Sequence, residues 1–231
     1  MTCDRLELVE RYRDHDAEVF RHCNSWGNPD FARSKMHLQA LGGLACPEEV
    51  LRAERLPPFS SDQTSPGYVT DGFTRDQEDQ VNASSYFRVI SGPLEERLTA
   101  CVQTLRAPVR ALLGTPWRIQ NIRVYSTPPK AKPSLMYGWH EDGMPDSIFK
   151  VMLYFTPMDV EHGGLEIDRD APRLLTGPPS WLLFYNSGVT HRGVPGTTYE
   201  RCACEIVISR AREFDLALHQ PGLNAHYLLF P

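Results

Sequence analysis

Four side chains that can bind a metal ion and an anion follow one another in the second half of the chain. His140 and Asp142 stand two positions apart, and Arg201 stands ten positions after His191. Two imidazoles and one carboxylate can hold a ferrous ion on one face, which leaves coordination positions open for O2 and a co-substrate. An arginine stays charged and offers a planar fork to a carboxylate. The set therefore predicts an open iron site beside a cation that can hold the far carboxylate of a keto acid.

The spacing of these residues fits a site built on strands. In an extended chain, residues i and i+2 project to the same side, so His140 and Asp142 can reach one ion. His191 follows the apolar segment 180–185 and can close the face from a neighbouring strand end. We expect a hairpin between His191 and Arg201 to return the arginine to the metal. A zinc hydrolase with the same three ligands is disfavoured, because it does not explain the arginine.

Five segments rich in β-branched and aromatic residues predict the strands that position the site. They are residues 117–125, 147–156, 165–167, 180–185 and 201–209. Turns rich in glycine and proline separate the segments, including a turn predicted at 193–196. Many short strands that follow helices predict a mainly β fold with flanking helices, in which a jelly roll has helices packed on one of its sheets.

Helices and loops are expected before the strands. The first fifty residues space their apolar side chains as a helix does. A second helix is predicted from Gly92, with Pro93 in its first turn. Pro108 should kink or end this helix, and Gly114 should cap it. Residues 56–92 are rich in Pro, Ser, Gly and Asp, and they are expected at the surface, either as a lid over the site or as a tolerated insertion.

Length and composition predict a single domain, 1–231, with three parts. These are a mostly helical and loop N-terminal part at 1–115, a jelly-roll core that carries the site at 116–212, and a C-terminal tail at 213–231. A net charge of -5 and the lack of a Lys/Arg run argue against a nucleic-acid partner. The sequence has no signal peptide and no apolar run of membrane-spanning length, so the expected location is the cytoplasm, with no membrane partner. The oligomeric state does not follow from the sequence.

The cysteines are predicted to be reduced and buried rather than metal ligands. There are six of them, Cys3, Cys23, Cys46, Cys101, Cys202 and Cys204. Without a secretory signal, reduced thiols are the default. Cys202 and Cys204 form the one close pair, and no second pair completes a zinc tetrad. We therefore expect these thiols to behave as small apolar side chains.

Three motifs resemble those of the 2-oxoglutarate- and Fe(II)-dependent dioxygenases. They are WHEDG at 139–143, GGLE at 163–166, and HRGVP at 191–195 followed by Arg201. The resemblance covers roughly residues 117–209, and it is nearest to the prolyl-hydroxylase-like and phytanoyl-CoA-hydroxylase-like groups. It implies a double-stranded β-helix, a form of jelly roll. It also implies that Fe(II), 2-oxoglutarate and O2 are used together, with the keto acid converted to succinate and CO2.

The same resemblance implies roles for individual residues. His140, Asp142 and His191 match the three iron ligands of the family, and Arg201 matches the residue that pairs with the distal carboxylate of 2-oxoglutarate. Tyr154 resembles a tyrosine that hydrogen-bonds this carboxylate. Tyr125 resembles a second co-substrate contact, although both tyrosines could instead be ordinary strand aromatics. Because Asp142 is present, halogenation is disfavoured, since the halogenases of the superfamily lack this carboxylate.

The alternation of side chains gives candidates for substrate binding. Asn121 and Arg123 share one strand face, and Lys150 shares a face with the tyrosine at 154. A lysine inside the barrel is costly unless it meets an anion. Arg123, Lys150 and Asn121 are therefore candidates to bind a substrate, or a keto-acid carboxylate in the case of the two cations. The alternative is a solvated sheet edge, or an ion pair with Glu166 or Glu205.

Together these observations predict an enzyme that hydroxylates an unactivated C–H bond of a small-molecule metabolite. In such an enzyme the metal and co-substrate carry the difficult chemistry, while the protein positions the substrate and excludes water. One alternative is a prolyl-hydroxylase-like oxygenase that acts on a peptide or protein. Another is a non-catalytic, cupin-like protein that binds a metal and a small acid without turnover.

Overall fold

The computed structural model describes residues 28–55, 86–130, 138–141, 148–168, 171–185 and 189–210. For residues 86, 87, 120 and 121 it describes the backbone alone. Asp142 and nearly all of the proposed lid, residues 56–85, lie outside these ranges. The same holds for Cys3 and Cys23.

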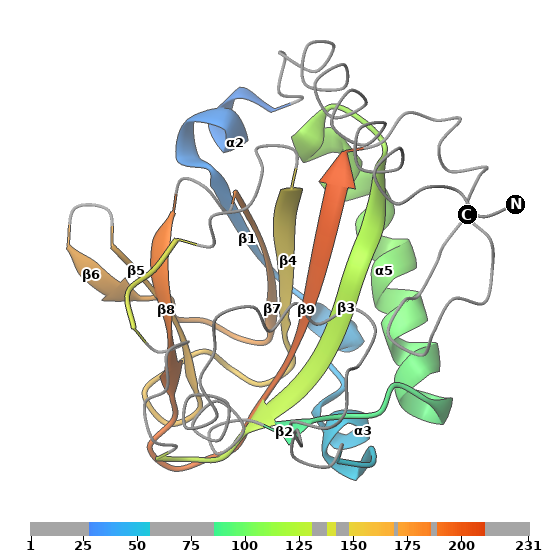
Figure 1. Ribbon diagram of the computed structural model, residues 1–231, viewed down its shortest axis with the longest axis vertical. Coiled ribbons are helices and arrows are strands. Elements are labelled where there is room, and N and C mark those ends of the chain that lie inside the picture. Colours follow the sequence, from blue (N-terminus) through green and yellow to red (C-terminus); the bar gives the residue numbers. More distant parts are fainter. Residues whose placement is uncertain are drawn as a thin grey trace, which may run out of the picture.

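A large antiparallel sheet forms the frame of the molecule, with strand order β1-β7-β4-β9-β3-β2. Its strands are β1 (Met36–Ala40), β2 (Tyr86–Phe87), β3 (Trp117–Thr127), β4 (Ile148–Tyr154), β7 (Ser180–Tyr185) and β9 (Arg201–Arg210). A smaller sheet, of order β6-β5-β8, faces it (Figure 1). This sheet contains β5 (Gly163–Asp168), β6 (Pro172–Leu174) and β8 (Thr190–Pro195). Two facing antiparallel sheets preceded by helices confirm the predicted jelly roll.

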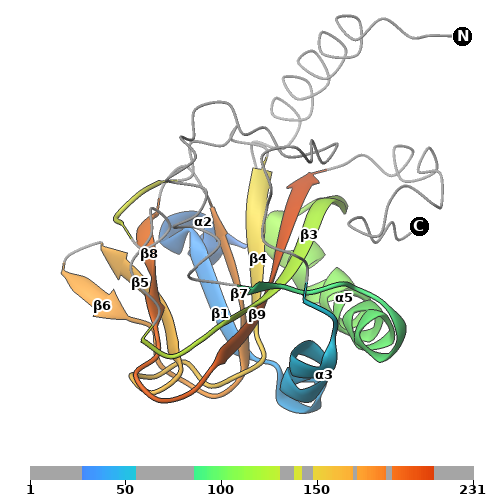
Figure 2. The ribbon, with the colours of Figure 1, turned by 60° about the horizontal axis from the view of Figure 1, so that its bottom comes forward.

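The helices lie mainly against the outer face of the large sheet (Figure 2). They are α2 (Pro29–Ser34), the 3-10 turn η1 (Gly42–Leu44), α3 (Pro47–Arg52) and α5 (Gly92–Leu113). As predicted, α5 has Pro93 in its first turn, and Gly114 ends it in the left-handed conformation at φ 71°. Of the two outcomes expected at Pro108, a kink or a helix end, the helix end is wrong, because α5 continues through this residue to Leu113.

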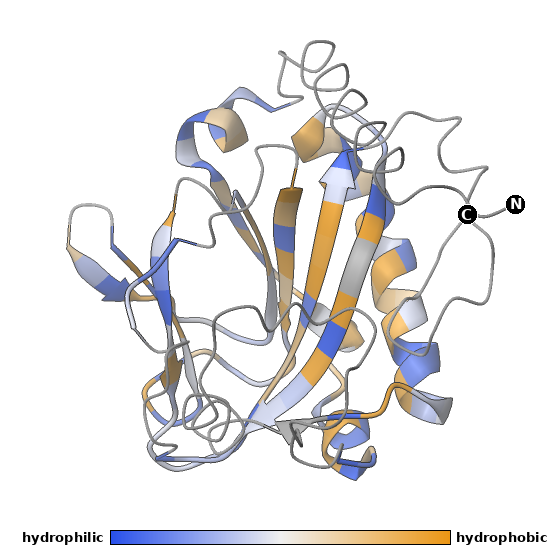
Figure 3. Ribbon diagram, in the orientation of Figure 1, coloured by the Kyte–Doolittle hydropathy of each residue, from blue (hydrophilic) through white to orange (hydrophobic). Residues whose placement is uncertain are grey.

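Alternation along the central strands divides the apolar residues into two cores. The outer core lies between α5 and the large sheet, and its members include Leu98, Val102, Leu105, Ile122, Val151, Leu153, Cys204 and Ile206. The inner core lies between the two sheets and contains Met152, Tyr154, Met158, Leu165, Ile167, Leu175, Leu182, Phe184, Val189 and Ala203. Because both faces of β4 and β9 are covered, these strands are largely hydrophobic. In contrast, hydrophobic and hydrophilic residues alternate along α5 (Figure 3).

Three expectations about the elements need correction. Residues 36–40, expected to be helical, form strand β1 and pair with β7. Pairing at the edge of the sheet outweighs the helical spacing of the apolar residues in this segment. Residues 193–195, expected in a turn, belong to β8. The connection from β8 to Arg201 is not a hairpin, since β8 pairs with β5 and β9 pairs with β3 and β4. The chain crosses from the small sheet to the large one at this point.

Four free thiols, which we call the outer thiols, confirm the expectation for the cysteines inside the described ranges. They are Cys46, Cys101, Cys202 and Cys204, and all four are buried in the outer core. Burial raises the pKa of Cys46 to about 12, that of Cys101 to about 11 and that of Cys202 to about 12. Thiols with such pKa values are poor nucleophiles and poor metal ligands at neutral pH.

None of the described helices is long and apolar enough to cross a membrane.

Candidate active site

The two predicted histidine ligands lie on separate segments of the chain and are brought side by side. His140 and His191 form an isolated antiparallel bridge, in which each backbone N–H donates to the other residue's carbonyl at 3.0 Å. Their ring centroids are 4.5 Å apart. The bridge therefore brings together two imidazoles that are fifty-one positions apart in the sequence.

Each imidazole is oriented by a backbone carbonyl two residues earlier. The Nδ1 atom of His140 lies 2.8 Å from the carbonyl oxygen of Gly138, and that of His191 lies 2.8 Å from the carbonyl oxygen of Val189. A carbonyl can only accept, so each Nδ1 carries the proton and each Nε2 keeps its lone pair. This is the arrangement by which proteins prepare histidines to bind metals.

The predicted carboxylate ligand, Asp142, lies outside the described residues. Within the described ranges, no group of three or more His, Cys, Asp and Glu side chains is placed to hold a metal ion. The histidine pair therefore offers two of the three predicted donors within those ranges. Glu141, which could have been a donor, instead accepts a hydrogen bond from the Thr190 hydroxyl at 3.1 Å.

Arg201 is buried at the start of β9, between the two sheets. Its Nη1 donates to the carbonyl oxygens of Gly164 at 2.8 Å and Val194 at 2.9 Å, both on the small sheet. Its Nη2 donates to the Thr127 hydroxyl at 3.2 Å. The buried Nε has no hydrogen-bond partner within the part of the chain that the structure describes. A buried, charged donor without an acceptor is costly, and a bound carboxylate would satisfy it.

The Gly163–Gly164 pair explains how Arg201 reaches the small sheet. Gly163 has φ +81°, and a Cβ atom there would lie 2.2 Å from the Val194 carbonyl oxygen. Only glycine permits this approach. The same carbonyl oxygen accepts from Arg201. The glycine motif and the arginine, which the sequence showed as separate signals, thus belong to one structural unit.

Tyr154 faces the same interior space as Arg201. It belongs to the inner core, and burial raises the pKa of its phenol to about 12 even though Arg201 lowers it. The phenol is therefore protonated at neutral pH and can donate a hydrogen bond. Tyr125 is partly buried against the same core. Both tyrosines lie on the inner face, as the alternation predicted.

Thr127 is a functional candidate that sequence reasoning missed. It is buried at the end of β3, directly opposite Arg201 in the register of β3 and β9. The predicted strand stopped two residues earlier, at Tyr125. Extending the same alternation by one further step places Thr127 on the face of Arg123 and Tyr125.

Arg123 and Lys150 face the interior and share one carboxylate. Arg123 is hydrogen-bonded to Glu205, and the Lys150 Nζ atom lies 3.6 Å from a Glu205 oxygen. Burial alone would raise the pKa of Glu205, but the two cations outweigh it and hold that pKa below its usual value. The ion pair with Glu205, an alternative from the sequence, is present, whereas Glu166 pairs with Arg192 instead.

The aromatic ring of Phe184 lies between this ion cluster and the histidine pair. It contacts His191 edge-to-face with 5.0 Å between centroids, and the Lys150 Nζ atom lies 5.9 Å from its centre. Asn121, the third substrate candidate, pairs with Val207 just after a register shift in β3. Its side chain lies outside the described part of the structure.

Comparison with known proteins bears on the fold. No known family profile and no curated protein matches the sequence. Among solved structures, the chain is similar to an oxidoreductase of the 2OG-Fe(II) oxygenase family from Burkholderia pseudomallei, with TM-score 0.51 and 11% identity over 85% of this chain and 91% of that chain. It is also similar to SnoN, a non-heme alpha ketoglutarate dependent epimerase from nogalamycin biosynthesis, with TM-score 0.51 and 15% identity over 92% and 93% of the two chains. The chain has the fold of the 2OG-Fe(II) oxygenases.

The fold of the 2OG-Fe(II) oxygenases implies a metal ion and 2-oxoglutarate, and the residues of this chain suit both. The two Nε2 lone pairs can bind a divalent metal, and the Nε of Arg201 can donate to a carboxylate. His191 and Val194 are three residues apart on β8, which is roughly 10 Å along an extended strand. Arg201 binds the Val194 carbonyl. The histidines could therefore hold a metal while Arg201 holds the far carboxylate of a keto acid.

Proposed function

We propose that the protein is an Fe(II)- and 2-oxoglutarate-dependent dioxygenase that hydroxylates an unactivated C–H bond of a small molecule. The observation that carries this proposal is the pair of oriented histidines, His140 and His191, on the same jelly roll as a buried arginine with an unsatisfied donor. Asp142 is proposed as the third metal ligand. When bound, the metal and 2-oxoglutarate supply O2 activation, with the keto acid converted to succinate and CO2 and one oxygen atom inserted into the substrate.

The chain's own residues would hold the co-substrate at its far end. Arg201 provides the charge, and Thr127 and Tyr154 provide hydroxyl groups on the same inner face. Tyr125, partly buried against the inner core, is proposed as a further contact. The apolar side chains of that core exclude water, which strengthens each of these electrostatic interactions.

Substrate binding is proposed on the other side of Phe184. Lys150 lies there, one aromatic ring away from His191. Arg123 shares the Glu205 carboxylate with Lys150, and Asn121 precedes Arg123 by two residues on β3. Two cations that share one carboxylate form a site in which an anionic group of a substrate can be held. The proposed substrate is therefore a small molecule that bears a carboxylate or a comparable anion.

Anaerobic titration of the metal-free protein with Fe(II) and then 2-oxoglutarate tests the assignment of the cofactors. The expected result is a visible metal-to-ligand charge-transfer band, lost in His191→Ala and Asp142→Ala. Arg173→Ala serves as a control, since this arginine is exposed on β6, an edge strand of the small sheet. Tight Fe(II) binding without the band would refute the proposed use of 2-oxoglutarate.

Two other functions make different predictions. A peptide hydroxylase should convert 2-oxoglutarate to succinate faster when a proline-containing peptide is added. A protein that binds metal and acid without turnover should give the charge-transfer band but release no succinate with any substrate. Anion-bearing small molecules that stimulate succinate release would favour the proposed function over both alternatives.

A further inference from the structure

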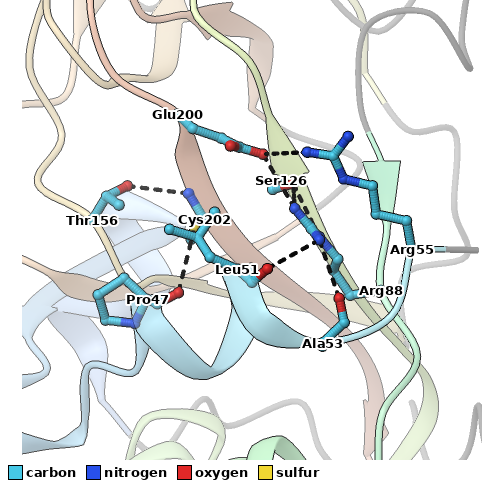
Figure 4. Close-up of polar contacts among 9 residues, drawn as sticks. All are labelled: Pro47, Leu51, Ala53, Arg55, Arg88, Ser126, Thr156, Glu200 and Cys202. Atoms are coloured by element: carbon cyan, nitrogen blue, oxygen red, sulfur yellow. Dashed lines mark hydrogen bonds and ion pairs between the residues drawn. The ribbon is translucent and has the colours of Figure 1, made fainter.

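Arg88, which directly follows β2, is buried and makes an unusually complete set of hydrogen bonds (Figure 4). Its Nε and Nη2 atoms donate to the Ser126 hydroxyl at 3.1 and 2.6 Å. Its Nη1 donates to the carbonyl oxygens of Leu51 and Ala53, where α3 ends, at 3.3 and 3.1 Å. Its Nη2 also donates to Glu200 at 3.3 Å. One side chain thus joins a helix end, a strand of the large sheet and the residue that precedes β9.

The residues held by Arg88 are chain neighbours of the proposed carboxylate site. Ser126 precedes Thr127, and Glu200 precedes Arg201. In the antiparallel register of β3 and β9, Thr127 lies opposite Arg201 and Ser126 lies opposite Cys202. Successive residues of a strand point to opposite faces. Arg88 and Ser126 therefore act on the outer face of the strand pair whose inner face presents Thr127 and Arg201.

The contacts of Arg88 are strong enough to set this geometry. Its side chain is 3% exposed and pairs with Glu200, which is 26% exposed. Hydrogen bonds in which one partner is charged are roughly twice as strong as those between neutral groups. Arg55 also approaches Glu200, at 4.0 Å, but it is half exposed, so its contribution is small. Fixing Ser126 and Glu200 fixes the backbone on which the Thr127 hydroxyl and the Arg201 guanidinium are mounted.

We propose that Arg88 is a positioning residue for the co-substrate: it holds the ends of β3 and β9 so that Thr127 and Arg201 are aligned to receive a carboxylate. This inference rests on the proposed function. Among the described residues, the polar contacts of Arg88 involve neither β8 nor the His140 bridge, so its effect should reach the co-substrate and spare the metal. In metal sites, residues that orient ligands from behind change affinity by about 10–100-fold.

The test measures metal and 2-oxoglutarate affinities separately, in the anaerobic full-length protein. For Arg88→Met, the dissociation constant of 2-oxoglutarate from the Fe(II)-loaded protein should rise at least about 10-fold. The Fe(II) dissociation constant should stay within about twofold. Arg88→Lys should lie between wild type and Arg88→Met, because one ammonium cannot reach the hydroxyl, the two carbonyls and the carboxylate together. Arg97→Met is the control, since Arg97 pairs with Glu49 on α3 and has no contact with Ser126 or Glu200.

A merely structural role would give a different result. If Arg88 only stabilised the fold, metal and 2-oxoglutarate affinities would fall together, or neither would change in the folded variant. Either result would overturn the inference. If Arg88→Met does not fold, Ser126→Ala removes the hydroxyl that accepts from both Nε and Nη2 and should weaken 2-oxoglutarate alone.

Failure of the inference can be told apart from failure of the proposed function. If the wild-type protein with Fe(II) does not bind 2-oxoglutarate, the proposed function fails and the inference falls with it. If the wild type binds 2-oxoglutarate and the Arg88 and Ser126 variants bind it equally well, only the positioning role is wrong.

Discussion

Replacing Glu205 with glutamine should strongly destabilise the protein, because it leaves two cations in the interior without their shared carboxylate. Glu205 is hydrogen-bonded to Arg123 and ion-paired with Lys150. The substitution keeps the size and shape of the side chain, removes its charge and replaces one acceptor oxygen with an amide donor. Its effect therefore measures how much the carboxylate offsets the burial of the two cations.

The expected magnitude follows from the exposure of the three side chains. Lys150 is 9% exposed and Glu205 12% exposed, whereas Arg123 is 29% exposed and keeps part of its hydration. Removing one partner of a buried pair costs about 3–5 kcal/mol, while an exposed pair contributes about 0–1 kcal/mol. Because Arg123 is partly hydrated, we expect about 3 kcal/mol for Glu205→Gln, at the lower end of the buried range.

Urea unfolding at neutral pH measures this free energy, with Glu166→Gln as the matched control. Glu166 also pairs with an arginine across a sheet, but that pair is 37% and 20% exposed and should contribute less than about 1 kcal/mol. The double variant Glu205→Gln/Lys150→Met should recover part of the loss, since methionine can pack against Phe184. A cost for Glu205→Gln no larger than that for Glu166→Gln would refute the reasoning.

The stability difference between wild type and Glu205→Gln should also depend on pH, in a direction set by the pKa of Glu205. The pKa of Glu205 is lowered in the folded protein, so the unfolded chain takes up this proton at higher pH than the folded one. The stability contributed by the carboxylate is present above the unfolded pKa and is lost as the pH falls through the folded pKa. The difference between wild type and Glu205→Gln should therefore shrink in acid. A difference that stays constant down to the lowest pH would contradict the lowered pKa.

Three further perturbations give separate tests. Arg201→Ala should raise the 2-oxoglutarate dissociation constant about 100-fold or more and change Fe(II) affinity little, whereas Arg173→Ala, at an exposed position of β6, should change neither. Equal 2-oxoglutarate binding by Arg201→Ala and wild type would contradict the role of Arg201. Gly163→Ala should cost more than about 2 kcal/mol in urea unfolding, because its Cβ would meet a carbonyl at 2.2 Å, whereas Gly43→Ala, with open space around the new atom, should be nearly neutral. Burial raises the pKa of Cys46 and Cys202 to about 12 and that of Cys101 to about 11, so the unfolded state loses these protons first and stability should fall between pH 9 and 11. The slope should be about 1.4 kcal/mol per pH unit for each thiol, and a flat profile would contradict burial of the thiols.

The sequence predicted the elements whose pattern is strong and local. The segment at 180–185 is a strand with the predicted bounds, since a serine followed by five apolar or aromatic residues between turns leaves little choice. The alternation also placed Lys150 and Tyr154 on one inner face, because the period of a strand is fixed by its geometry. The two histidines and Arg201 could be selected by residue type and spacing alone.

What the sequence missed depends on pairing between distant segments. Strand β1 forms because residues 36–40 pair with β7. The local sequence pattern does not indicate this partner. The crossing between β8 and β9 was read as a hairpin, since a glycine- and proline-rich stretch looks alike whether the chain turns within a sheet or passes to another. The role of Arg88 was equally invisible, because its partners come from three separate parts of the chain.

Pairing of Arg55 with Arg88 holds together the two ends of the stretch from 56 to 85. The two residues form an antiparallel bridge, and the N–H of Val89 donates to the carbonyl oxygen of Glu54 at 2.8 Å. The entropy cost of closing a loop rises only slowly with its length. Residues 56–85 can therefore be exchanged, lengthened or shortened at little cost to the stability of the sheet. Changes in the length of this stretch should therefore leave intact the strands on which Thr127 and Arg201 are mounted.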